Sequence, residues 1–222
     1  MIHVCYALRD ESGKYSKFVG TSIQSLLENT KENVTIHILH DSTLSNENQR
    51  KLQKLVYILE QEIVFHNVDE LLMNEIKKIE KNVQFFDSSR NKIAPFYRLL
   101  IPQILSKEVS RVIYLDGDTL VNLDINSLWT INLEGNSIAA TPEILAAKDA
   151  QNYLKKHPPV KSGVVDSQDY FNSGILVIDL SQVRKLGGGG GINPTRSLPR
   201  NSKNFWTGSK INRSRFTECT LQ

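Results

Sequence analysis

Residues 111–121 read Arg-Val-Ile-Tyr-Leu-Asp-Gly-Asp-Thr-Leu-Val, an apolar run that ends in two acidic residues. The β-branched segment 109–115 is typical of a buried strand, and Asp116 and Asp118 follow it directly. Open α/β sheets bind ligands at the carboxyl ends of their strands. Hard divalent cations prefer oxygen ligands, so this pattern predicts that Asp116 and Asp118 bind Mn²⁺ or Mg²⁺ together with a diphosphate.

A solvated turn is the alternative interpretation of the acidic pair. Aspartate and glycine are common turn formers, and the Asp-x-Asp spacing arises often by chance. Taken alone, Asp116, Gly117 and Asp118 are therefore compatible with an ordinary turn. The apolar strand before them favours a functional site.

The segments around this motif alternate between strand and helix patterns. Strands are expected over residues 2–8, 34–40, 62–68, 109–115 and 170–180. Helices are expected over residues 18–29, from an N-cap at Ser45 to residue 59, and over 94–105, where Pro102 is expected to kink or end the first half. This alternation predicts an α/β fold with a mainly parallel sheet.

The chain divides near Leu186. Residues 1–186 carry the alternating pattern, whereas residues 187–222 begin with five glycines and continue with mostly polar residues. A glycine run loses much chain entropy on ordering, so it favours a flexible linker. We expect one globular domain over residues 1–186 and a disordered, Gly-rich tail over residues 187–222.

Composition places few limits on function. A net charge of +3 and 40% hydrophobic residues are ordinary for a globular protein and give no support to nucleic-acid binding. The sequence has no apolar run long enough to span a membrane and no pattern of a signal peptide. Cys5 and Cys219 lack metal-site spacing and suit a reducing compartment. We therefore expect a cytoplasmic protein.

Three ordered motifs resemble glycosyltransferase family 8. They are Tyr-Arg-Leu-Leu-Ile-Pro at 97–102, Tyr-Leu-Asp-Gly-Asp-Thr-Leu-Val at 114–121 and Tyr-Phe-Asn-Ser-Gly-Ile-Leu-Val-Ile-Asp-Leu at 170–180. The family includes bacterial lipopolysaccharide galactosyl- and glucosyltransferases, and glycogenin. The resemblance, over about residues 2–180, implies a GT-A nucleotide-sugar-binding fold. It also implies metal-dependent, retaining transfer of a hexose from UDP-glucose or UDP-galactose to a glycan or glycolipid acceptor, as in the synthesis of lipopolysaccharide or another cell-surface glycan.

The resemblance also assigns site residues. Asp116 and Asp118 would bind the metal, with Gly117 close to the nucleotide. The residues that would contact uracil lie at the end of the first strand and in the loop after it: Ala7, Leu8, Asp10 and Tyr15. Packing on the following helix explains Tyr15 equally well.

The donor sugar has its own candidate residues. Arg98 would contact the donor, because a guanidinium offers a planar fork of donors to phosphate or hydroxyl groups. Asn172 and Ser173 would lie beside the donor sugar, and Glu143 stands where the family often has an aspartate near the sugar hydroxyls. Asn172 and Glu143 are the catalytic candidates that the resemblance implies.

The chain also departs from the family pattern. The loop 9–14 differs from the commoner version with two acidic residues. An Asp-Gln-Asp-x-Leu-Asn element and a His-x-x-Gly-x-x-Lys-Pro-Trp element, which supplies the third metal ligand, do not occur; His157 matches neither position. We therefore expect a fold truncated at its C-terminus, marginal stability, weak metal-dependent UDP binding and slight or undetectable transfer.

A change of reading frame is one hypothesis for these departures. Residues 213–222 can be encoded so that an adjacent frame reads Asp-Gln-Asp-Leu-Leu-Asn, which suggests a frameshift near Leu186. A gene sequence that yields no Asp-Gln-Asp in either alternative frame would contradict the hypothesis.

Other functions stay open at this point. The chain could be a UDP-binding domain or pseudogene product without catalysis, with turnover of a UDP-sugar as the discriminating observation. It could also be a phosphotransferase of the haloacid-dehalogenase type, whose first aspartate is a nucleophile, although that class lacks the Asn-Ser-Gly element. The expected partners are a UDP-sugar and an acceptor glycan or glycolipid, with peripheral association at the inner face of a membrane and no nucleic acid.

Overall fold

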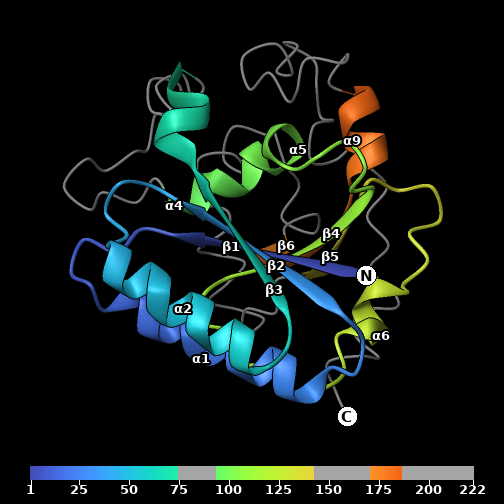
Figure 1. The fold of residues 1–222 in the computed structure, drawn as a ribbon. Coiled ribbons are helices and arrows are strands. Elements are labelled where there is room, and N and C mark those ends of the chain that lie inside the picture. The colour runs from blue at the N-terminus through green and yellow to red at the C-terminus, as the bar shows by residue number, and fades with distance from the viewer. Residues whose placement is uncertain (75–93, 143–170, 187–222) are drawn as a thin grey trace, which may run out of the picture.

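The computed structural model describes residues 1–74, 94–142 and 171–186 (Figure 1). Six strands in these ranges form one sheet in the order β3-β2-β1-β4-β6-β5. The strands are β1 (Ile2–Leu8), β2 (Val34–His40), β3 (Glu62–Asn67), β4 (Arg111–Leu115), β5 (Ile138–Pro142) and β6 (Phe171–Asp179). The helices with both ends in these ranges are α1 (Tyr15–Asn29), α2 (Asn46–Ile58), α4 (Ala94–Tyr97), the 3₁₀ turn η2 (Arg98–Leu100), α5 (Ile101–Ile104), α6 (Asn126–Trp129) and α9 (Leu180–Leu186), and residues 68–74 are helical as well.

The sheet is mainly parallel, as the sequence predicts. Strand β1 pairs in parallel with β2 and β4, and β2 pairs in parallel with β3. Strand β6 runs antiparallel to both of its neighbours, β4 and β5. As a result β6 begins where β4 ends, and Leu115 pairs with Ile175.

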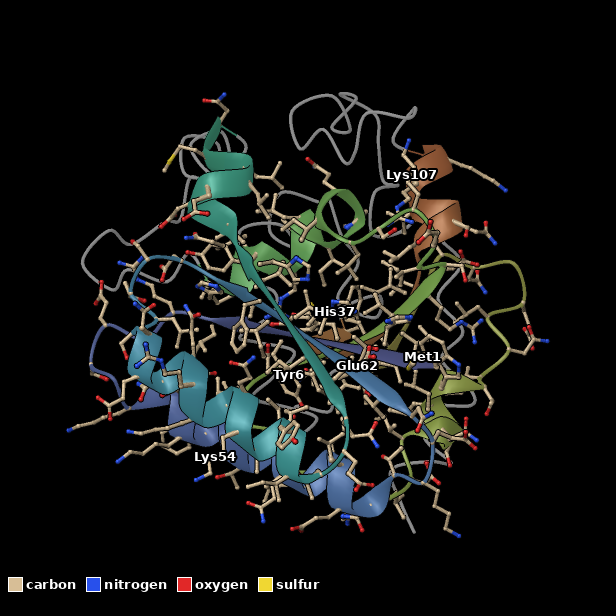
Figure 2. The ribbon with its side chains drawn as sticks, in the orientation of Figure 1. Met1, Tyr6, His37, Lys54, Glu62 and Lys107 are labelled. Atoms are coloured by element: carbon tan, nitrogen blue, oxygen red, sulfur yellow. The ribbon has the colours of Figure 1, made fainter. Side chains whose placement is uncertain are left out.

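Helices cover both faces of the sheet. Figure 1 shows α1 and α2 side by side on one face, and α4, α5 and α9 on the other. The alternation along β1 matches these two layers: Tyr6 belongs to the apolar cluster under α1 and α2, and Cys5 to the cluster under α4 and α5. In Figure 2, Tyr6 and His37 mark the two sides of the sheet.

Element boundaries differ in detail from the prediction. Ser45 caps α2 as expected, because its side chain accepts the N–H of Asn48 at 3.2 Å. Helix α1 starts earlier than residue 18, at Tyr15, whose N–H donates to Oδ1 of Asp10 at 2.7 Å. The expected helix over 94–105 is three short pieces. The irregular turn η2 directly precedes Pro102, which agrees with the expectation that this proline ends the first half. Pro102 itself lies in the first turn of α5, where a missing N–H is tolerated.

Arg184 on α9 joins this helix to the segment between α5 and β4. Its guanidinium donates to five backbone carbonyl groups, those of Pro102, Leu105, Ser106, Lys107 and Val109, at 2.8 to 3.4 Å. These include carbonyls at the C-terminal end of α5, where a cation also interacts favourably with the helix dipole. Arg184 therefore holds the approach to β4 in place.

Three imidazoles form a row across β1, β2 and β3. Nδ1 of His3 lies 3.1 Å from Nε2 of His37, and Nδ1 of His37 lies 3.1 Å from Nε2 of His66. Burial, together with the neighbouring His66 and His3, lowers the pKa of His37 to about 3. Burial also lowers the pKa of His3 and of His66. The lowered pKa values favour the uncharged form of all three imidazoles.

Several predictions from the sequence concern residues outside the described ranges. Glu143, His157, Tyr170 and the segment 187–222 all lie there. Within the described ranges, none of the helices has the length and apolarity that crossing a membrane requires.

Candidate functional site

The carboxylate of Asp116 is held from two sides where β4 ends. Its Oδ1 accepts a hydrogen bond from the Tyr114 hydroxyl at 2.8 Å and from Nη2 of Arg98 at 2.9 Å. The Arg98 guanidinium also stacks over the Tyr114 ring, 4.4 Å from its centroid. Arg98 is largely buried, whereas Asp116 is partly exposed. Water therefore weakens this ion pair less than it weakens a pair on the surface. Asp116 therefore has a defined orientation.

The start of β6 lies against the same carboxylate. The N–H of Asp116 donates to the Gly174 carbonyl at 2.8 Å, and Arg98 Nη1 donates to the Ser173 carbonyl. The Gly174 N–H in turn donates to Oδ1 of Asn172 at 2.8 Å. Asn172 and Ser173 are exposed. The structure thus brings together Arg98, Asp116 and residues 172–174, which the sequence predicts for one site from three separate motifs.

Gly117 is buried against α1. A Cβ atom at this position would lie 2.6 Å from Cγ2 of Val19 and 3.2 Å from Cε1 and the hydroxyl of Tyr15. Tyr15 is half-buried, and burial together with the charges of Asp118 and Asp116 raises its pKa. Tyr15 therefore packs beside the acidic turn and is also the first residue of α1. This position is compatible with both interpretations of Tyr15, contact with uracil and packing on the helix.

A chain of hydroxyl groups supports the turn from inside the domain. The Thr119 hydroxyl donates to the Asp116 carbonyl at 2.8 Å and lies 3.2 Å from Oγ of Ser22. Ser22 is 3.1 Å from the hydroxyl of the buried Tyr6. These contacts tie the turn after β4 to α1 and β1, so the turn has little freedom to rearrange.

The residues predicted to contact uracil lie at the end of β1. Ala7, Leu8 and Asp10 are all buried. Besides the Tyr15 N–H on its Oδ1, Asp10 accepts the Asn48 amide on Oδ2 at 3.0 Å, and its own N–H donates to Thr43 Oγ1 at 2.7 Å. Asp10 is thus engaged in shaping the loop between β1 and α1.

A second carboxylate cluster was not predicted from the sequence. Asp41 follows β2 and is buried, and its Oδ2 accepts hydrogen bonds from Nη1 of Arg9 at 2.8 Å and from the Tyr97 hydroxyl at 3.0 Å. Burial and the Asp41 charge raise the pKa of Tyr97. A signal was present in the sequence, since Asp41 follows an apolar strand just as Asp116 does.

Asp116 and Asp118 have the chemistry of a hard-cation site. Within residues 1–74, 94–142 and 171–186, no hydrogen-bond donor engages Oδ2 of Asp116 or the exposed carboxylate of Asp118. Free carboxylate oxygens are the ligands that Mn²⁺ and Mg²⁺ prefer. The same ranges contain no group of three or more His, Cys, Asp or Glu side chains that could hold a metal ion. These residues can therefore supply two ligand groups and leave other positions for a diphosphate or water.

Sequence comparison matches most of the chain to one family. The profile of Glycosyl transferase family 8 matches residues 4–187. General stress protein A of Bacillus subtilis (strain 168) is 29% identical over 77% of this chain and 54% of its own length. A probable galacturonosyltransferase-like protein 10 of Arabidopsis thaliana is 30% identical over 77% of this chain and 47% of its own length. The chain thus spans about half the length of the curated relatives it matches.

Structural comparison supports the same fold. The galactosyltransferase LgtC in complex with donor and acceptor sugar analogues aligns with a TM-score of 0.61 at 19% identity, over 83% of this chain and 60% of the other. Mouse xyloside xylosyltransferase 1 aligns with a TM-score of 0.62 at 18% identity, over 83% of this chain and 68% of the other. The GT-A fold predicted from the sequence is therefore confirmed.

Proposed function

Because this chain belongs to glycosyl transferase family 8, we propose that it binds UDP-glucose or UDP-galactose together with Mn²⁺ or Mg²⁺. The protein of which it forms part or the whole transfers the hexose to a glycan or glycolipid, with retention of the anomeric configuration. The class of enzyme follows from the family. The donor, the metal and the acceptor are the proposal.

One observation carries this proposal: Arg98, Asp116 and the start of β6 meet at the carboxyl end of β4. Ligands of open α/β sheets bind at such ends. The three segments lie far apart in the sequence, and Arg98 and Ser173 are 75 positions apart. A solvated turn would need neither the ion pair to Arg98 nor the close approach of Gly174, so the geometry favours a ligand site.

Asp116 and Asp118 would hold the metal, since oxygens of both carboxylates have no donor within the described ranges. When bound, such a cation supplies positive charge that offsets the charge on a departing diphosphate. Arg98 would add a second positive group next to Asp116 and, with Gly117 at the turn, would face the nucleotide. Asp116 itself stays oriented by Tyr114 and Arg98.

The remaining proposed contacts surround this centre. Asn172 and Ser173 are exposed at the start of β6 and are proposed to contact the donor sugar. Glu143 is proposed to approach the sugar hydroxyls. The base would lie near Ala7, Leu8, Asp10 and Tyr15, with Asp10 acting through the loop that it shapes.

The test is calorimetric titration of the chain with UDP, with and without Mn²⁺. We expect weak binding that needs Mn²⁺ and disappears in the Asp116→Ala/Asp118→Ala variant. The double substitution Glu28→Ala/Glu32→Ala removes two exposed carboxylates elsewhere and should leave binding unchanged. UDP binding that is indifferent to Mn²⁺ and to both aspartates would contradict the proposed site.

Catalysis needs a separate measurement. Release of UDP from UDP-glucose or UDP-galactose in the presence of Mn²⁺ should be slight, because the Asp-Gln-Asp element and the His element that supplies the third metal ligand in the family do not occur in this sequence. Binding without any release would favour the alternative, a UDP-binding domain without catalysis.

A further inference from the structure

Two aspartates in this domain are held in the same way. Asp41 follows β2, accepts a tyrosine hydroxyl and an arginine Nη, and is buried. Asp116 follows β4 and also accepts a tyrosine hydroxyl and an arginine Nη, but it is partly exposed. The proposed donor site uses only the second cluster. The cluster around Asp41 buries a charge and takes no direct part in that site, so its role needs a separate explanation.

The two clusters meet at consecutive residues of one short helix. Tyr97, which reaches Asp41, is the last residue of α4, and Arg98, which reaches Asp116, is the first residue of η2. Successive residues of a helical turn point about 100–120° apart, so neighbours in sequence can reach the ends of different strands. The segment from α4 to η2 thus links the ends of β2 and β4.

The position of this helix depends on its tertiary contacts. Helix α4 has four residues, and a helix of one turn has almost no stability of its own. The Tyr97 ring is buried in a cluster with Cys5, Ala7 and Leu39. Its hydroxyl bonds to Asp41, whose other oxygen, Oδ1, accepts the Thr43 N–H at 3.0 Å and hydroxyl at 2.5 Å. Tyr97 is therefore fixed at both its ring and its hydroxyl end.

We propose that Asp41 and Tyr97 are positioning residues that hold Arg98 against Asp116 and thereby set the affinity of the donor site. This inference rests on the proposed function. Through Arg9, Asp41 also holds the loop that carries Asp10. Asp41 thus connects the base end of the donor site to its phosphate end without touching the donor.

Removal of the Tyr97 hydroxyl isolates this effect. In Tyr97→Phe the ring stays buried, and Asp41 keeps Arg9 and Thr43 as partners, so no unpaired charge is left in the interior. We expect the affinity for UDP in the presence of Mn²⁺ to fall about threefold to tenfold, the effect that loss of one typical hydrogen bond would produce. Asp41→Asn, which weakens the hold on Arg9, should lower the affinity in the same direction.

A double-mutant cycle separates positioning from general destabilisation. If Tyr97 acts through Arg98, Tyr97→Phe should lower UDP affinity in the wild-type background and have little effect in an Arg98→Lys background. Equal loss in both backgrounds, or no loss in either, would overturn the inference. Val56→Ala, at a buried position on α2, is the matched control for stability and should leave the affinity unchanged.

A second readout does not depend on UDP binding. Nε of Arg98 donates to the Pro95 carbonyl at 2.6 Å, so its N–H should give a slowly exchanging NMR signal, identified by its loss in Arg98→Lys. In Tyr97→Phe this signal should shift, and its exchange with water should accelerate about threefold to tenfold. An unchanged signal refutes the positioning role. If wild-type chain fails to bind UDP with Mn²⁺, the proposed function fails, and this signal still decides whether Tyr97 positions Arg98.

Discussion

Gly174 leaves the space that the carboxylate of Asp116 occupies: a Cβ atom at position 174 would lie 2.8 Å from Oδ2 of Asp116. The backbones of the two residues are joined as well, since the Asp116 N–H donates to the Gly174 carbonyl at 2.8 Å. The carboxylate and the strand therefore cannot both stay in place if residue 174 carries a side chain. Glycine is needed here for close approach to a functional group.

Gly174→Ala should accordingly damage the proposed metal site more than the fold. The new methyl group would push the Asp116 carboxylate away, and displacements near 1 Å in such sites have large effects on function. We expect Mn²⁺-dependent UDP affinity to fall about tenfold or more, measured by calorimetry. Gly20→Ala on α1 is the control, because its Cβ would make only an ordinary contact, 3.5 Å from Leu52, and binding should be retained.

Gly117→Ala should mainly lower stability. Its Cβ would lie 2.6 Å from Cγ2 of Val19, which is too close for the buried interface between α1 and the turn after β4. We expect the free energy of unfolding to fall by about 1–3 kcal/mol, the usual effect of overpacking, as measured by urea denaturation. In a Val19→Ala background, which removes the clashing methyl group, Gly117→Ala should cost less than it does in the wild-type chain. An equal cost in both backgrounds would show that the clash with Val19 is not the cause.

Arg184→Lys should destabilise the domain without changing the proposed donor site. A lysine ammonium has three donors and no planar fork, so it cannot serve the five carbonyl groups that Arg184 contacts. A loss of about 1–3 kcal/mol is expected in urea denaturation. Lys185→Ala, at the exposed neighbouring position, should be nearly neutral. Equal effects at both positions would contradict the structural role of Arg184.

The row of imidazoles should make stability depend on pH. The pKa of His37 is about 3 in the folded chain, below its ordinary value of 6.5, because burial disfavours the charged form. The unfolded chain therefore binds a proton that the folded chain excludes, and stability falls as the pH drops from about 7 towards 3. Between pH 7 and 5 the loss from this group should be about 1–2 kcal/mol. Urea denaturation across that range should show a weaker dependence in His37→Gln, and an unchanged slope would contradict this assignment.

The sequence predicts much of the fold because its strands are continuous apolar runs. The apolar pattern predicts a strand over residues 34–40, and β2 spans Val34–His40. Strand β5 escaped prediction because Ile138–Pro142 is short and ends in a proline, a pattern that suits an edge strand. Among the strands that the structure describes, β5 pairs with β6 alone, at one edge of the sheet.

Local sequence patterns predict only part of the candidate site. Asp116 and Asp118 could be predicted because they follow a strand, and Arg98 and Asn172 because their motifs resemble a family. The bond between Tyr97 and Asp41 joins residues 56 positions apart, and no local periodicity carries that information. The burial of Asp10 could not be predicted from local pattern either, because Asn48, which donates a hydrogen bond to Asp10, lies on α2.

The reversed direction of β6 has a consequence for the order of folding. Ser173 must return across 75 positions of chain to reach Arg98, and contacts of such long sequence separation carry a large loop-closure entropy and tend to slow folding. The sheet can pair β1 with β2 and β2 with β3 while the polypeptide is still short. A nascent chain that has emerged only to the turn after β4 would therefore contain Asp116 and Asp118 but lack the proposed donor site, since that arrangement forms only when β6 docks.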